Sequence, residues 1–153
     1  MNPRGLTVCV VGAGGAARSV IDALARAGAS EVCVVNRTMS RARDAALLAG
    51  EAGRVGDWDD AARADLLVNA TSVGMGADEL PVPVDVLRSG QVVADLVYHP
   101  LDTALLRAAR ERGARSLDGL GMLVHQAALQ FSLWTGLDAP VTEMRRARSE
   151  EHT

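Results

Sequence analysis

Lysine is absent from this sequence, so arginine supplies all 16 of its Lys and Arg residues. Aromatic residues are also scarce, at 3% of the chain, whereas apolar residues make up 48%. The core must therefore be aliphatic, and runs of Val separated by stretches rich in Ala, Leu and Arg are typical of parallel strands that alternate with helices. A net charge of −3 argues against a surface for nucleic acid or for membranes.

Other absences narrow the class further. No stretch approaches the roughly 20 apolar residues that span a bilayer, and residues 1–4 do not have the layout of a signal peptide. Cys9 and Cys33 each lie in an apolar run without a C-x-x-C spacing, so we interpret them as core thiols of a reduced, cytoplasmic protein. The three histidines have no ligand spacing, and we expect no metal site.

Hydrophobic periodicity predicts an alternation of strands and helices. Strands are expected at 6–11, 31–35, 65–69, 91–96 and 115–117, and helices at 15–27, 38–50, 57–62, 103–112, 120–134 and after Pro140. A loop is expected at 71–84. The order implies an α/β fold, a three-layer Rossmann-type doubly wound parallel sheet with helices on both faces. The 120–134 helix should carry one apolar stripe, made of Leu120, Leu123, Val124, Ala127, Phe131 and Trp134.

A glycine-rich segment follows the first strand and opens the first helix: Gly12, Ala13, Gly14, Gly15, Ala16 and Ala17. It fits G-x-G-x-x-A, in which Gly12 permits the tight turn, Gly14 lets the backbone approach a pyrophosphate and Ala17 keeps the helix close to the sheet. The helix N-terminus offers free N–H groups and a positive dipole. A turn without a ligand is the alternative, and the β-α-β context favours nucleotide binding.

The second strand is followed by Asn36, Arg37, Thr38, Met39, Ser40 and Arg41. An NAD site would place an acid here for the ribose hydroxyls, but Glu31 lies at the opposite end of the strand. Arg37 and Arg41 are one helical turn apart, so both can converge on an adenosine 2′-phosphate, and Asn36 can bond the ribose. The alternative is that Thr38 caps a helix and Arg41 pairs with Asp44; we expect Thr38 to cap in either case.

Three later segments fall at the same edge of the predicted sheet: 69–75, 95–100 and 118–127. Ligands of open α/β sheets bind outside the carboxyl ends of strands, so the small polar residues of 69–75 are expected to face a nicotinamide ribose or a substrate. Tyr98, the only tyrosine, is a candidate substrate contact. Gln126 offers a donor and an acceptor, whereas His125 is better explained as part of the polar face of a helix.

In this order, GAGGAARSV, NRTMSR, NATSVGM, DLVYHP and DGLGMLVHQAALQFSLWTG resemble the C-terminal NADP-binding domain of the shikimate dehydrogenase family, from about Leu6 to Val141. The resemblance implies NADPH-dependent reduction of 3-dehydroshikimate to shikimate, in aromatic amino-acid biosynthesis. It also implies roles for residues. The 12–16 loop would hold the pyrophosphate and 36–41 the 2′-phosphate. Thr71, Leu96 and Gly119 would line the nicotinamide side, and Tyr98 and Gln126 would reach the substrate.

One departure from that family is large. The family's catalytic lysine and aspartate belong to an N-terminal substrate domain, but this chain has five residues before its first strand and no lysine. Ketone reduction needs a proton donor at the carbonyl oxygen. Tyr98 and His99 could substitute only through a different mechanism. We therefore expect no catalytic residue here, an inactive isolated chain, and shikimate binding only together with the missing domain.

The resemblance also divides the chain. Residues 1–118 would form the NADP-binding Rossmann domain, and residues 119–153 would be C-terminal helices that pack back toward the substrate domain. Without that partner we expect exposed apolar surface on these helices, covered by self-association or by swapped helices. Three alternatives remain: a quinate/shikimate dehydrogenase relative, a non-catalytic NADP(H)-binding module, and a structural Rossmann domain with an empty site.

Overall fold

The computed structural model describes residues 1–150 and contains one six-stranded sheet, in which every strand is parallel to its neighbours. The strand order is β3-β2-β1-β4-β5-β6, so the chain reverses direction across the sheet between β1 and β4. This order confirms the doubly wound Rossmann-type prediction. The strands are β1 (Thr7–Val11), β2 (Glu31–Val35), β3 (Gly53–Val55), β4 (Leu66–Asn69), β5 (Val92–Asp95) and β6 (Arg115–Leu117).

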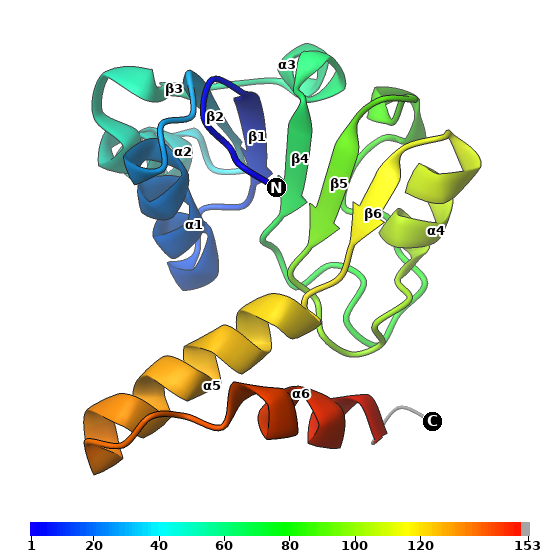
Figure 1. The fold of residues 1–153 in the computed structure, drawn as a ribbon. Coiled ribbons are helices and arrows are strands. Elements are labelled where there is room, and N and C mark those ends of the chain that lie inside the picture. Colours follow the sequence, from blue (N-terminus) through cyan, green and yellow to red (C-terminus); the bar gives the residue numbers. More distant parts are fainter. Residues whose placement is uncertain (151–153) are drawn as a thin grey trace.

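Helices cover both faces of the sheet (Figure 1). The α-helices are α1 (Gly15–Arg26), α2 (Met39–Ala46), α3 (Trp58–Arg63), α4 (Ala104–Glu111), α5 (Leu120–Thr135) and α6 (Val141–Glu150). Two 3-10 helices, η1 (Leu47–Ala52) and η2 (Val84–Val86), complete the set. Among the described residues, no helix is both long enough and apolar enough to cross a membrane.

Alternation along the strands divides the core into two layers. Val8 and Val10 of β1 face α1 and α2 and pack with Ile21, whereas Cys9 and Val11 face α3 and α4. Successive side chains of a strand point to opposite faces, so strands buried on both sides read as continuous apolar runs. Full burial of a side chain such as Ile21 contributes about 1.5–3 kcal/mol.

The third strand and the end of the second helix differ from expectation. Strand β3 was not predicted, because its three residues, Gly53–Val55, include a glycine and an exposed arginine and give no apolar run. The helix expected at 38–50 ends as an α-helix at Ala46 and continues as η1, which has a kink at Gly50. Gly53 lies so close to the Ala46 carbonyl that a Cβ would be 2.0 Å from its oxygen.

The two C-terminal helices project from the carboxyl edge of the sheet and pack against each other (Figure 1). The single apolar stripe predicted for α5 is wrong in part, because only Leu120, Val124 and Ala128 are buried and Trp134 is 81% exposed. Apolar residues occur around the whole helix rather than on one side. The expected exposed apolar surface is confirmed at the end of α5 by Leu129, Leu133, Trp134 and Leu137.

Candidate functional site

The loops that follow four strands are joined at the carboxyl edge of the sheet. The Gly12 N–H donates to the Val35 carbonyl at 2.9 Å, and the Ala70 N–H donates to the Val11 carbonyl at 2.8 Å. The Leu96 N–H donates to the Asn69 carbonyl at 3.0 Å. These bonds continue the ladders of β1, β2, β4 and β5 beyond the last strand residues. The segments predicted to bind a ligand therefore form one continuous surface.

The glycines of the first loop differ in what they meet. Gly12 has φ +114°, and a Cβ there would be 2.9 Å from the Ala70 oxygen, so the fold itself requires glycine. Gly14 has φ −79°, which any residue adopts, and a Cβ on Gly14 or Gly15 would meet no atom within 4 Å. The fold places no demand for glycine at 14 and 15. The open space beside Gly14 and Gly15 is where a ligand could approach the protein backbone closely.

Helix α1 begins at this loop without a side-chain cap. Its first intrahelical bond runs from the Arg18 N–H to the Gly14 carbonyl at 2.9 Å, so the N–H groups of Gly15, Ala16 and Ala17 have no acceptor within the helix. Gly14, Gly15 and Ala16 are exposed, whereas Ala17 is buried and holds the helix against the sheet. The exposed N–H groups and the helix dipole suit an anion at this point.

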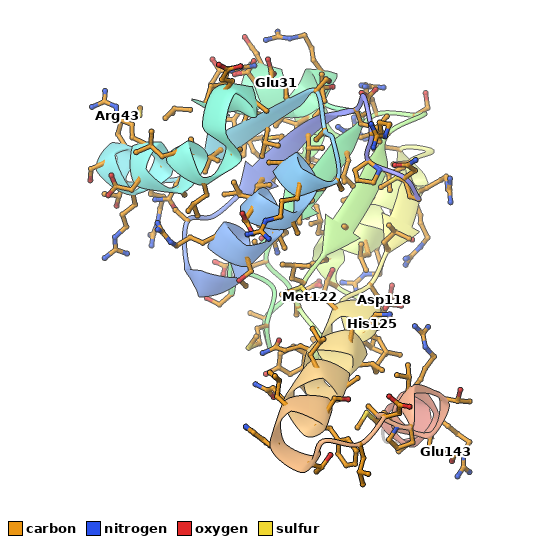
Figure 2. All side chains as sticks on the ribbon, turned by 60° about the vertical axis from the view of Figure 1, so that its left-hand side comes forward. Glu31, Arg43, Asp118, Met122, His125 and Glu143 are labelled. Atoms are coloured by element: carbon orange, nitrogen blue, oxygen red, sulfur yellow. The ribbon has the colours of Figure 1, made fainter. Side chains whose placement is uncertain are left out.

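Of the two candidate arginines, Arg37 lies in the turn between β2 and α2, and Arg41 lies in the first turn of α2. Arg37 and Arg41 are exposed, and neither forms a salt bridge within residues 1–150. The suggested pairing of Arg41 with Asp44 is therefore absent from the described part of the chain. Both guanidinium groups keep their donors for a ligand. Figure 2 shows Glu31 at the far side of the molecule from Asp118, which marks the carboxyl edge.

Asn36 and Thr38 shape the turn before α2 in different ways. The Asn36 side-chain amide donates to the Thr38 carbonyl at 3.0 Å and so shapes the turn before α2. Thr38 occupies the N-cap position, but its side chain makes no capping bond, so the prediction that it caps is wrong. Its extended backbone, φ −99° and ψ 107°, is enough to begin the helix. Asn36 is half-buried with its amide group engaged, which leaves its carbonyl oxygen to meet a ribose.

Beneath the loops after β4 and β5 lies a buried polar network that sequence reasoning missed. The Asn69 amide donates to Asp95 Oδ1 at 2.9 Å, and the Thr103 hydroxyl donates to Asp95 Oδ2 at 2.7 Å. Asn69, Asp95 and Thr103 are all no more than 1% exposed. The expectation that Asn69 faces a ligand is thus wrong, because its side chain points inward. Burial raises the pKa of Asp95, and its three hydrogen bonds oppose that rise.

Thr71, Leu96 and Gly119 lie in the loops after β4 and β5 and at the start of α5. The Thr71 hydroxyl donates to Asn69 Oδ1 at 2.7 Å, which joins it to the buried network. A Cβ on Gly119 would be 2.7 Å from the Leu96 and Val97 carbonyl oxygens, so only glycine permits this contact between the start of α5 and the loop after β5. A Cβ on Gly12 would also be 3.1 Å from Thr71 Cγ2, so the glycine loop and the Thr71 loop are in close contact.

The two candidate substrate residues extend from this surface. Tyr98 follows β5 and is 39% exposed, and Gln126 is exposed in the second turn of α5. His125 is exposed next to it, as its interpretation as a helix-surface residue requires. Figure 2 shows Asp118, Met122 and His125 gathered where α5 leaves the sheet. This part of the surface is open to solvent and to a partner domain.

A cavity of about 210 Å³ lies at the opposite edge of the sheet, and its lining is already paired. Arg54 donates to both oxygens of Asp60 at 2.8 Å and to Glu31 at 2.7 Å. The Arg54 guanidinium holds the pKa of Asp60 well below its usual range. Cys33 also lines the cavity, and the Cys33 hydrogen bond and burial raise the pKa of Cys9. We interpret this cluster as a structural ion-pair network.

Comparison with known protein families matches two segments of the chain. The family described as shikimate/quinate 5-dehydrogenase matches residues 2–74, and the shikimate 5′-dehydrogenase C-terminal domain matches residues 119–147. The shikimate dehydrogenase (NADP(+)) of Moorella thermoacetica is 45% identical over 161 residues, which cover 97% of this chain and 55% of the relative. The chain thus spans about half the length of the relatives it matches.

Solved structures agree with the sequence relatives. Shikimate 5-dehydrogenase from Thermus thermophilus, in complex with NADP(H) and shikimate, superposes with a TM-score of 0.85 at 42% identity, over 94% of this chain and 54% of that one. Quinate dehydrogenase from Corynebacterium glutamicum, in complex with NAD, superposes with a TM-score of 0.87 at 37% identity, over 95% and 55%. With this parallel sheet and these joined loops, the chain belongs to the shikimate dehydrogenase family.

Proposed function

We propose that the chain binds NADP(H) along the carboxyl edge of its sheet. The observation that carries this proposal is the pair of exposed arginines, Arg37 and Arg41, at the end of β2, free of salt bridges in the described part of the chain. Planar guanidinium groups bond phosphate through several donors at once, and an acid would be needed there to prefer the ribose hydroxyls of NAD. The pair therefore favours a cofactor with a 2′-phosphate.

The remaining elements fit the rest of such a cofactor. The exposed start of α1, with open space above Gly14 and Gly15, would receive the pyrophosphate. Asn36 would meet the adenosine ribose through its carbonyl oxygen. Thr71, Leu96 and Gly119 would line the nicotinamide half. When bound, NADPH supplies a hydride, and the residues of this chain bind and orient it.

The arginine pair is tested by titrating NADPH and NADH against the wild type, Arg37→Ala and Arg43→Ala. A lost charge-assisted hydrogen bond costs about 1.5–3 kcal/mol, which is about tenfold or more in Kd. We expect Arg37→Ala to lose NADPH affinity by that factor and to leave NADH binding nearly unchanged. Arg43 is exposed on the other side of α2 and points outward (Figure 2), so Arg43→Ala should match the wild type. Equal affinity of the wild type for both cofactors would refute the arginine assignment.

We further propose that the whole protein is an oxidoreductase that reduces 3-dehydroshikimate to shikimate. Reduction of the ketone needs a proton donor beside the hydride, and these 153 residues contain no lysine. We infer that residues 1–118 form the cofactor domain, that 119–153 pack toward a substrate domain outside these residues, and that the donor lies in that domain. Tyr98 and Gln126 would then contact the substrate from the cofactor side.

This division is tested by assaying shikimate oxidation with NADP⁺ for the chain alone and after adding a relative's substrate domain. We expect no turnover alone and measurable turnover of the mixture. Turnover by the chain alone would overturn the division into two halves. Quinate, used in the same assay with NAD⁺ and NADP⁺, distinguishes a quinate dehydrogenase; the arginines at 37 and 41 favour NADP⁺ with either substrate.

A second copy of the chain is the partner we propose for the end of α5 when no substrate domain is present. Leu129, Leu133, Trp134 and Leu137 are each at least 63% exposed and lie within three turns of one another. Apolar side chains gathered in this way are buried by association in most soluble proteins. Dimers or swapped helices would remove them from water.

A further inference from the structure

The buried side chains of Asn69, Asp95 and Thr103 connect three segments that meet under the proposed nicotinamide end. Asn69 is the last residue of β4, Asp95 is the last residue of β5, and Thr103 is the N-cap of α4. Asp95 accepts from Asn69 at 2.9 Å, from Thr103 at 2.7 Å and from the Val97 N–H at 3.0 Å. These three partners are neutral. Burial of a carboxylate costs free energy unless hydrogen bonds replace the lost water. Here three donors supply such bonds to the Asp95 carboxylate.

The network continues outward to the ligand-facing loops. Asn69 Oδ1 accepts from the Thr71 N–H at 3.1 Å and from the Thr71 hydroxyl at 2.7 Å. The Thr71 oxygen then accepts from the Val73 N–H at 3.1 Å. On the other side, the Val97 N–H is held by Asp95, and the Val97 carbonyl lies against Gly119. The Thr71 loop is thus joined to Asp95 through Asn69, the loop of Leu96 is joined to it through the Val97 N–H, and Gly119 packs against that second loop.

Two acceptors favour one orientation of the Asn69 amide: the Asp95 carboxylate at 2.9 Å and the Val73 carbonyl at 3.3 Å both accept from its NH₂ group. An ionised carboxylate only accepts hydrogen bonds, so Asn69 must turn its NH₂ group toward Asp95. Its oxygen is then left for Thr71, which donates from both its N–H and its hydroxyl. If Asp95 were neutral and could donate, the stronger of these two constraints on the amide would be lost, and the acceptor of the Thr71 loop would be held less firmly.

We propose that Asp95 and Asn69 are positioning residues that hold the loops of Thr71 and Leu96 in place for the nicotinamide half of the cofactor. This inference rests on the proposed NADP(H) binding. It concerns only the nicotinamide half, because Gly14, Arg37 and Arg41 are not members of the network. The adenosine half should therefore bind equally well whether or not the network is intact.

The test compares two probes: NADP⁺, and 2′,5′-ADP, which has the adenosine 2′-phosphate but no nicotinamide. Asp95→Asn keeps the side-chain volume but can donate, which removes the shorter of the two hydrogen bonds that favour one amide orientation. Loss of a hydrogen bond to a charged group predicts that the Kd of NADP⁺ rises about tenfold, while that of 2′,5′-ADP changes less than about twofold. Thr71→Val, which removes only the hydroxyl bonds, should move the NADP⁺ Kd in the same direction.

Asn69→Asp provides a readout that a loss of stability would not produce. Two carboxyl groups 2.9 Å apart cannot both be ionised, so the pair holds one proton up to a raised pH. While that proton is present, the new acid can donate to Asp95 and accept from Thr71, as the amide does. The ratio of the two Kd values should then be near that of the wild type at low pH and rise above it as the pH increases. The wild type is measured at each pH as the reference, because the 2′-phosphate titrates in both probes but the 5′-phosphate monoester titrates only in 2′,5′-ADP.

The outcomes separate this inference from the proposed function. If the wild type binds neither probe, the proposed function fails and this inference fails with it. If the wild type binds both but the variants weaken both probes equally, the network only stabilises the fold and the positioning role is overturned. A ratio equal to that of the wild type in Asp95→Asn and Thr71→Val, with the same pH dependence in Asn69→Asp as in the wild type, also overturns it.

Discussion

The three glycines of the loop before α1 are under different constraints. Gly12 is needed by the fold, because its φ is positive and the Ala70 carbonyl leaves no room for a Cβ. Gly14 and Gly15 have neither constraint, since their missing side chains would point into open space. A residue that costs conformational entropy without serving the fold is best explained by a ligand. Substitutions in this loop can therefore distinguish a glycine that is needed for stability, Gly12, from glycines proposed to be needed for binding, Gly14 and Gly15.

Substitution of Gly15 should therefore weaken binding without destabilising the protein. Gly15→Ala lies in the first turn of α1, where alanine is favoured over glycine by about 0.5–1 kcal/mol. We expect the free energy of unfolding in urea to stay constant or rise, while the NADPH Kd increases on the order of tenfold, about 1.4 kcal/mol. Gly12→Ala is the matched contrast and should lower stability by about 1–3 kcal/mol. Unchanged NADPH affinity in Gly15→Ala would argue against a pyrophosphate at this turn.

At the scale of elements, apolar runs and the glycines beside them were enough to predict most strands of the sheet. Five of the strands could be predicted because each is a short apolar run or lies beside a clear turn, whereas β3 has no such pattern. The glycine loop and the arginine turn were predictable because their chemistry is local. The Asn69–Asp95 pair was not, because its two members are 26 residues apart and meet only when β4 pairs with β5. A polar residue at a strand end gives no sign of which way it points.

Helix α3 depends on a single carboxylate that serves several partners. Asp60 accepts from the Asp57 N–H at 3.0 Å in a capping box, from Arg54 through two bonds and from Arg63 at 2.8 Å. Its side chain is only 11% exposed, whereas the side chains of its partners Arg54 and Arg63 are 42% and 71% exposed. The start of α3 and the β3 edge are thereby joined through one residue.

Loss of this charge should destabilise the protein in a pH-dependent way. We expect Asp60→Asn to lower the free energy of unfolding at pH 7 by about 2–3 kcal/mol, as for lost hydrogen bonds to a charged group. The folded-state pKa of Asp60 is lowered, so its contribution is present above the unfolded pKa of about 3.9 and is lost as the pH falls toward the lower folded value. Urea unfolding at several pH values measures this.

The control for that experiment is the neighbouring residue. Asp59 is exposed, and no hydrogen bond or salt bridge involves its side chain in the described part of the chain. Asp59→Asn should therefore change stability by no more than about 0.5 kcal/mol. A destabilisation by Asp60→Asn that stays constant from pH 7 to pH 3 would show that the effect comes from packing and not from charge.

At the scale of the whole molecule, exposed apolar residues are concentrated near the end of α5. The body of the sheet is covered by helices, whereas α5 and α6 extend from its carboxyl edge (Figure 1). Polar residues dominate α6, but the end of α5 exposes leucine and tryptophan. The same edge carries the proposed cofactor site. A partner that covers α5 would therefore also come close to the bound cofactor.

Self-association should depend on the end of α5. We expect sedimentation or light scattering to show an average mass that increases with concentration for the wild type and stays monomeric for Leu133→Glu, because the charge prevents burial of the apolar surface. Leu47→Glu is the matched control, since Leu47 is 76% exposed on η1 and Leu133 is 81% exposed. It should associate like the wild type. A wild type that is monomeric at every concentration would contradict the proposal.

The position of β1 at the centre of the sheet has a consequence for synthesis on the ribosome. This strand emerges before the other five strands of the sheet, yet its neighbours are β2 on one side and β4 on the other, and β4 follows only after two further strands have been made. One row of β1 peptide groups therefore has no sheet partner until residues 66–69 leave the exit tunnel. Long-range parallel pairing is slow, and unpaired edges aggregate. The nascent chain should accordingly need protection by chaperones until β4 has emerged.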